Sequence, residues 1–101
     1  MASRLNLQSE LERILGSRNV YFQPPESLMI KYDAIVYSLD GINTLKANNK
    51  NYKLNKAYKL THIHEDPDSE IHAELLALPY CRFDRRFISD NLYHDVYTLY
   101  Y

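Results

Sequence analysis

From Tyr52 onward, apolar and polar side chains alternate along the chain. The positions that share one face of an extended backbone are apolar or aromatic: Tyr52, Leu54, Tyr58 and Leu60. The positions of the opposite face are polar: Lys53, Asn55, Lys59 and Thr61. Because successive side chains of a strand point to opposite faces, this period of two predicts a strand of about twelve residues with one solvated face.

Further segments have the composition of strands. Val20–Phe22 is a short one, ended by Pro24 and Pro25, which cannot donate a backbone hydrogen bond to a sheet. Ala34–Leu39 is almost continuously apolar, which predicts a central strand covered on both faces. The C-terminal segment 81–101 gives two more strands around a turn-forming Ser-Asp-Asn triplet.

Two segments have the period of a helix. In the first, apolar residues recur on one helical face, with Ser3 in position to cap its start and Gly16 placed for a left-handed exit. These apolar residues are Leu7, Leu11, Ile14 and Leu15. In the second, Asp66 is a good N-cap, Pro67 suits the first helical position and Pro79 ends the helix. Its buried stripe is predicted to be Ile71, Leu75 and Leu78.

The predicted order of elements is α-β-β-β-α-β-β. It defines an α+β fold, an antiparallel β-sheet of about five strands with two helices packed on it. The 101 residues form one domain, 1–101. Residues 41–51 are polar and show no periodicity, so we interpret them as a long exposed loop or a flexible hairpin arm. The positions expected in the core are Leu11, Ile14, Ile35, Val36, Leu60, Ile71 and Leu75.

Composition excludes several classes of protein. The net charge of −1 argues against a partner that is simply nucleic acid or an anionic membrane, since either demands a basic excess. The apolar runs are too short to span a bilayer, and the N-terminus lacks the pattern of a signal peptide. The two glycines leave no P-loop and no dinucleotide-binding fingerprint. Cys81, the only cysteine, is expected to be a buried thiol in a reducing compartment, and no cofactor is predicted.

The four histidines raise the question of a metal site. His62 and His64 would point to the same face of a strand, a spacing at which two imidazoles can share a metal. The acidic residues beside them are explained as a helix start, however, and the sequence identifies no third ligand. A triad of Ser89, His94 and Asp95 fails on geometry, because adjacent strand residues project to opposite faces. We therefore predict no metal site and no catalytic residue, with a small metal-binding enzyme using His62 and His64 as the weaker alternative.

Charge is divided between two blocks of the chain. Residues 44–60 contain five lysines and no acid, whereas residues 64–74 contain five acids and no lysine or arginine. A basic arm and an acidic patch suit head-to-tail contact between identical copies, which closes into a ring when the rotation permits. The interface residues we expect are Lys46, Asn48, Asn49, Lys50, Lys53, Glu65, Asp68, Glu70, Tyr100 and Tyr101.

Two stretches, "ILGSRNVYFQPPESLMIKYDAIVYSL" and "CRFDRRFISDNLYHDVYTLYY", resemble the small tail terminator proteins of long-tailed bacteriophages, also described as tail completion or head–tail joining proteins. The resemblance covers nearly the whole chain in its order of elements, from a leading helix to a tyrosine-rich terminal hairpin. One departure is Asp33, where the family pattern leads us to expect proline before Ala34.

The resemblance implies a structural virion protein that forms a homohexameric ring at the head-proximal end of the tail tube. There it would stop tube growth and join the tail to the head connector, after assembly in the host cytoplasm. The implied partners are other copies of the chain, the tail tube protein, the connector or stopper protein and DNA passing through the lumen without sequence specificity; no membrane is implied. Another head–tail connector or a minor virion protein fits the same features, and a monomeric protein that binds a host factor is a further alternative.

Overall fold

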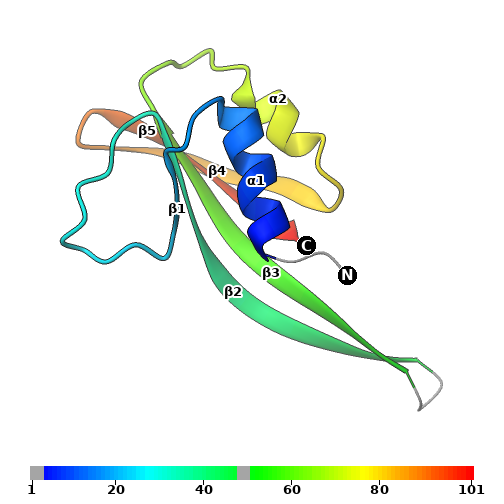
Figure 1. Cartoon of the computed structure of the whole chain (residues 1–101). Helices are drawn as coiled ribbons and strands as arrows, with labels where there is room; N and C mark the ends of the chain where they lie inside the picture. Colours follow the sequence, from blue (N-terminus) through cyan, green and yellow to red (C-terminus); the bar gives the residue numbers. More distant parts are fainter. Residues whose placement is uncertain (1–3, 48–50) are drawn as a thin grey trace.

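The structure is a computed structural model and describes residues 4–47 and 51–101, with side chains described outside residues 43–55. Its elements follow one another as predicted (Figure 1). They are α1 (Arg4–Leu15), β1 (Val20–Phe22), β2 (Ala34–Ala47), β3 (Asn51–His64), α2 (Ile71–Leu76), β4 (Cys81–Ser89) and β5 (Leu92–Tyr100). The order α-β-β-β-α-β-β confirms the α+β fold class.

The five strands form one sheet in the order β1-β2-β3-β5-β4. The pairs β2–β3, β3–β5 and β5–β4 are antiparallel, as predicted. The exception is β1, which runs parallel to β2 with Val20 opposite Ile35. The segment 23–33, which contains the double proline, carries the chain back to the end of the sheet at which β1 began, so β2 starts in the same direction (Figure 1).

Both helices pack on one face of the sheet and enclose the core (Figure 1). The core side chains are Leu7, Leu11, Ile14, Val20, Ile35, Tyr37, Tyr58, Leu60, Leu75, Tyr97 and Leu99. Of the residues predicted to be in the core, Val36 and Ile71 are only half-buried. Val36 alternates with Ile35 and therefore points to the sheet face opposite to the helices, and Ile71 is the first residue of α2. The prediction that this strand is covered on both faces is thus wrong at Val36.

Of the two interpretations of residues 41–51, a loop or a hairpin arm, the described residues support the arm. β2 continues to Ala47, which pairs with Asn51 at the start of β3, and the ladder shifts register once, between Leu39 and Gly41. The two strands leave the body as a long hairpin, which gives the molecule extents of 50 × 29 × 23 Å (Figure 1). A hairpin beyond the core needs no apolar face, because cross-strand hydrogen bonds satisfy its backbone, so the polar composition of this segment is compatible with a hairpin arm. We call residues 41–47 and 51–57 the arm.

The second helix begins later than predicted. The Asp66 carboxylate accepts a hydrogen bond from the Asp68 amide at 2.9 Å, and the Asp66 carbonyl accepts one from the Ser69 amide at 3.2 Å. These bonds make 66–69 a turn, because an aspartate that bonds the amide two residues on competes with the helix. The N-cap is Glu70 and not Asp66. The exit of α1 is as predicted, with Gly16 at φ +78°; Ser3 lies outside the described residues.

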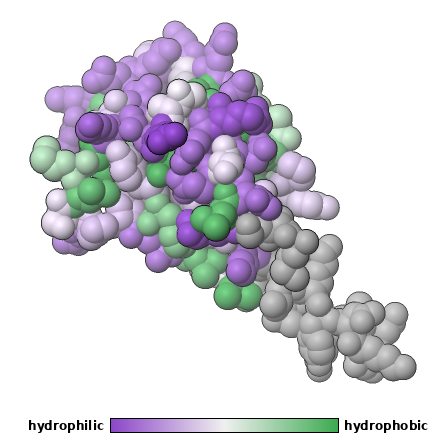
Figure 2. Space-filling view, viewed as in Figure 1, coloured by the Kyte–Doolittle hydropathy of each residue, from purple (hydrophilic) through white to green (hydrophobic). Residues whose placement is uncertain are grey.

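The face of the molecule seen in Figure 2 is mostly hydrophilic, with hydrophobic side chains gathered near the base of the arm. Two large apolar residues of β2 are exposed in that part of the chain, Leu39 and Ile42. Among residues 4–47 and 51–101, neither helix has the length and apolarity needed to cross a membrane.

Candidate functional site

A cluster of ionisable groups is buried under α2, at the end of β3 farthest from the arm. His62 and His64 lie on the helix-facing side of β3, as their spacing predicted, and their rings stack with centroids 4.2 Å apart. In the β3–β5 ladder His62 is the direct partner of Asp95. The three residues are 1 %, 0 % and 1 % exposed, and one ligand atom from each lies within 4.8 Å of the others. Asp95 is the third group that sequence reasoning did not find.

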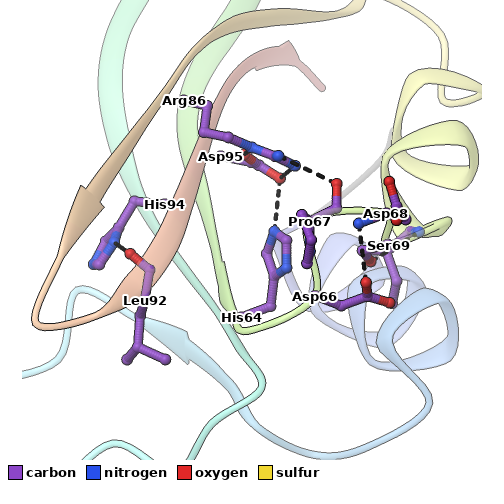
Figure 3. A network of polar contacts seen from close by, with 10 residues as sticks. His64, Asp66, Pro67, Asp68, Ser69, Arg86, Leu92, His94 and Asp95 are labelled. Carbon is purple, nitrogen blue, oxygen red and sulfur yellow. Dashed lines mark hydrogen bonds and ion pairs between the residues drawn. The ribbon is translucent and has the colours of Figure 1, made fainter.

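Arg86 completes the cluster from the neighbouring strand β4. Its Nε donates to Asp95 Oδ1 at 2.5 Å and its Nη2 donates to Oδ2 at 3.0 Å, while Nη1 reaches the carbonyl of Pro67 at 3.3 Å (Figure 3). A register shift between Phe83 and Arg85 inserts Asp84 as an extra residue. This bulge moves the alternation of β4 by one position, so that Arg86 comes to stand opposite Asp95.

The protonation of the cluster follows from these bonds. Burial alone would raise the pKa of the Asp95 carboxyl, but hydrogen bonds from Arg86 and His64 outweigh it and hold the pKa below its usual value. His64 Nε2 lies 2.7 Å from Asp95 Oδ2 (Figure 3). Because an ionised carboxylate only accepts hydrogen bonds, His64 Nε2 carries a proton, and in the neutral form of this ring Nδ1 holds the lone pair.

His62 is buried as a neutral imidazole. Burial, assisted by the neighbouring His64, lowers the pKa of His62 to about 4. Among the residues that the structure describes, neither ring nitrogen of His62 has a hydrogen-bond partner, and His64 Nδ1 also lacks one. Buried polar atoms without partners are rare in proteins, so these three nitrogens require an explanation.

A cleft connects the cluster with the surface. It has a volume of about 400 Å³ and lies between α2 and β4. Its lining residues are His72, Leu76, Phe83, Arg86 and Asp95. The cleft thus reaches the Arg86–Asp95 pair, whereas His62 and His64 are not among its lining residues.

The rejected triad is indeed not assembled. Asp95 lies with Arg86 on the helix side of the sheet, whereas His94 stacks on Phe87 with ring centroids 4.8 Å apart. A ring nitrogen of His94 lies 3.1 Å from the carbonyl oxygen of Leu92. Adjacent residues of β5 thus serve opposite faces, as strand geometry requires.

The charged residues predicted for an interface fall at two distant places. Glu65, Asp68 and Glu70 are exposed in the segment between β3 and α2, whereas Lys46 and Lys53 occupy backbone positions in the arm. Figure 1 shows these two regions at opposite ends of the molecule. Asn48, Asn49 and Lys50 lie outside the described residues.

The two C-terminal tyrosines differ in their exposure. Tyr100 is 37 % exposed at the end of β5, and its amide donates to the carbonyl of Tyr80 at 3.2 Å. Tyr101 is packed against the core, and its amide donates to the carbonyl of Lys56 at 3.0 Å. Of the two residues, Tyr100 is the more exposed, and Tyr101 is half-buried.

Sequence signals for the missing members of the cluster are weak. Asp95 alternates with Tyr93, Tyr97 and Leu99, so a carboxylate stands at a position whose neighbours on that face pack against other residues. A charge at a core-facing position demands a partner. The identity of that partner, Arg86, depends on the β4 bulge, which no local sequence pattern indicated.

Comparison with protein-family models, with curated proteins and with solved structures finds no match to this chain. The fold and the cluster therefore define it only as an α+β protein with a mostly antiparallel five-stranded sheet, two helices on one face and a buried His-His-Asp-Arg group.

Proposed function

We propose that this chain is a structural subunit of a long-tailed bacteriophage, a tail terminator that forms a ring at the head-proximal end of the tail tube. The resemblance in residues extends to an order of elements, and the structure has that order from α1 to the β4–β5 hairpin. The proposal assigns the protein to the virion, where it stops tube growth and binds the head connector.

One observation carries the proposal: opposite charges stand at opposite ends of an elongated molecule. β3 runs from the arm to the acidic segment, and its 14 residues cover about 46 Å at roughly 3.3 Å per residue. The lysine positions of the arm therefore cannot meet Glu65, Asp68 and Glu70 within one copy. Between copies they can meet head to tail, and such a contact closes into a ring if the rotation permits.

The base of the arm supplies apolar area for the same contact. Leu39 and Ile42 are exposed on β2 immediately before the arm residues whose side chains are not described. Complementary charges set orientation and speed of association, and buried apolar side chains supply more of the affinity. A neighbouring copy seated against the arm would cover Leu39 and Ile42 while pairing its acidic segment with the lysines.

The buried cluster does not lead us to propose an enzyme. A catalytic metal keeps a coordination position open to substrate, whereas the imidazole rings of His62 and His64 are at most 1 % exposed. The Asp95 carboxylate also accepts two hydrogen bonds from Arg86 and one from His64. The arrangement is that of a group that holds β3, β4 and β5 together.

The decisive experiment is electron microscopy of tail tubes polymerised from the tail tube protein of the same phage, with and without the purified chain. We expect tubes of limited length whose ends carry a ring, with six-fold symmetry in end-on class averages. Rings found on isolated head connectors but not on tubes would assign the chain to a neighbouring connector position. Tubes of unchanged length with bare ends, together with bare connectors, would overturn the assignment to the head–tail junction.

A further inference from the structure

The unpaired nitrogens of the buried cluster point to a ligand. His62 Nδ1, His62 Nε2 and His64 Nδ1 are fully buried and lack hydrogen-bond partners among the described residues. One nitrogen of a neutral imidazole carries a proton and the other carries a lone pair. The cluster therefore presents at least two unused lone pairs, one on each ring, beside a carboxylate.

The donors and their spacing suit a transition metal. Imidazole nitrogens and a carboxylate are ligands for zinc and for its neighbours cobalt and nickel. Ligand atoms from His62, His64 and Asp95 lie within 4.8 Å of one another. Zinc–nitrogen bonds of about 2.0–2.1 Å need donors about 3.3 Å apart in a tetrahedral site. The ligand atoms must therefore close by up to about 1.5 Å, and the stacked rings must turn so that their lone pairs meet at the cation.

The hydrogen bond between His64 and Asp95 resembles the arrangement that orients metal-binding histidines. A ligating imidazole commonly donates its other N–H to a carboxylate, which fixes the tautomer and the ring. Here His64 Nε2 donates to Asp95 Oδ2, and this leaves Nδ1 as the atom with the lone pair. The two strands β3 and β5 hold this pair in register, since His62 stands directly opposite Asp95.

We propose that His62 and His64 bind one zinc-like divalent cation through their imidazole nitrogens, and that Asp95 orients His64 and supplies a compensating negative charge. Arg86 limits the affinity of the site for a cation, because its guanidinium places a positive charge beside the Asp95 carboxylate. A carboxylate offers about four lone-pair positions, and three of those of Asp95 are occupied by Arg86 and His64. Because His64 Nε2 donates to Asp95 Oδ2, a cation bound at His64 Nδ1 lies on the other side of the ring, so Asp95 orients His64 and keeps Arg86 without touching the cation.

Isothermal titration of the chelator-treated full chain with Zn²⁺ tests the site, together with the visible spectrum after addition of Co²⁺. We expect one equivalent of metal per chain and a visible cobalt absorption band typical of a site of low symmetry. His62→Gln and His64→Gln should each weaken binding by about tenfold or more, as the loss of a ligand or of its orienting partner does. His94→Gln and His72→Gln are the matched controls, because His94 lies on the other face of the sheet and His72 is exposed on α2.

The outcomes separate a buried site from adventitious binding. Absence of stoichiometric binding, or binding that survives His62→Gln and is lost in His72→Gln, would overturn the proposal. If the His62 and His64 variants do not fold, the wild-type chain still tests the site, by NMR of the imidazole nitrogen resonances during a Zn²⁺ titration. Shifts confined to His62 and His64 support the site, and shifts confined to His72 and His94 refute it. None of these readouts depends on ring formation, so the metal site and the proposed function stand or fall separately.

Discussion

Leu75 and Leu76 are adjacent leucines of α2 with opposite environments, and they offer a matched test of how this helix packs. Leu75 is 0 % exposed and belongs to the core between α2 and the sheet, whereas Leu76 is 41 % exposed beside the cleft. Substitution by alanine removes the same atoms at the same helix propensity in both cases. The difference between the two variants therefore reports burial alone.

The magnitudes follow from that burial. A fully buried leucine replaced by alanine costs about 2–5 kcal/mol, from lost transfer free energy and from the cavity left behind. We expect Leu75→Ala near the lower half of this range, about 2–3 kcal/mol, because a helix of six residues can shift to close part of the cavity. Leu76→Ala should cost about 1 kcal/mol or less, since it leaves no cavity and much of its side chain is already in water.

Urea unfolding followed by circular dichroism measures both variants against the wild-type chain. The midpoints should separate clearly while the slopes stay equal, because the same surface is exposed on unfolding. For a domain whose total stability is about 5–15 kcal/mol, the loss in Leu75→Ala is readily measured. Equal midpoints for the two variants, or a larger loss for Leu76→Ala, would show that α2 does not pack on the sheet by the face described.

Three further predictions concern the cluster, the thiol and the arm. In the presence of a chelator, the free energy of unfolding should fall between pH 7 and pH 4 by about 3 kcal/mol more in the wild-type chain than in His62→Gln. The reason is that the imidazole of His62 takes up a proton near pH 6.5 in the unfolded chain but only near its pKa of about 4 in the folded one. Parallel pH profiles of the two proteins in urea unfolding would contradict this. Burial, with a contribution from Asp84, raises the pKa of the Cys81 thiol to about 11. At pH 8 the folded chain should therefore react with an aromatic disulfide reagent about 100-fold more slowly than the unfolded chain, because the thiolate is the reacting form. Equal rates for the two states would refute this. Reversal of the arm lysines to glutamate should leave the circular dichroism unchanged but impair ring formation or tube capping. The defect should be strongest at low salt, where repulsion from the acidic segment is least screened. Partial rescue by reversal of the acids to lysine would support the pairing, and normal tails without such a rescue would refute it. The lysines are Lys46 and Lys53 of the arm and Lys50, which lies between its two strands in the sequence, and the acids are Glu65, Asp68 and Glu70.

The sequence by itself determined which kind of element most segments form. Apolar spacing within α1, alternation along β3 and the Gly16 exit are set by residues a few positions apart, and all three are present in the structure. Such patterns act locally, because a helix or a strand exposes a fixed period of side chains to whatever covers it. The predicted order of elements and the α+β class followed from them.

The tertiary structure decided everything that depends on how strands pair. The parallel direction of β1 and the extension of β2 and β3 into an arm each depend on which strand supplies the backbone partners. The cluster is the clearest case: His64, Arg86 and Asp95 come from three strands, and their meeting requires both the β3–β5 register and the one-residue bulge in β4. A shift of one residue in a strand turns every side chain to the other face. The sequence could place each of these residues on a strand, but the register alone placed them against one another.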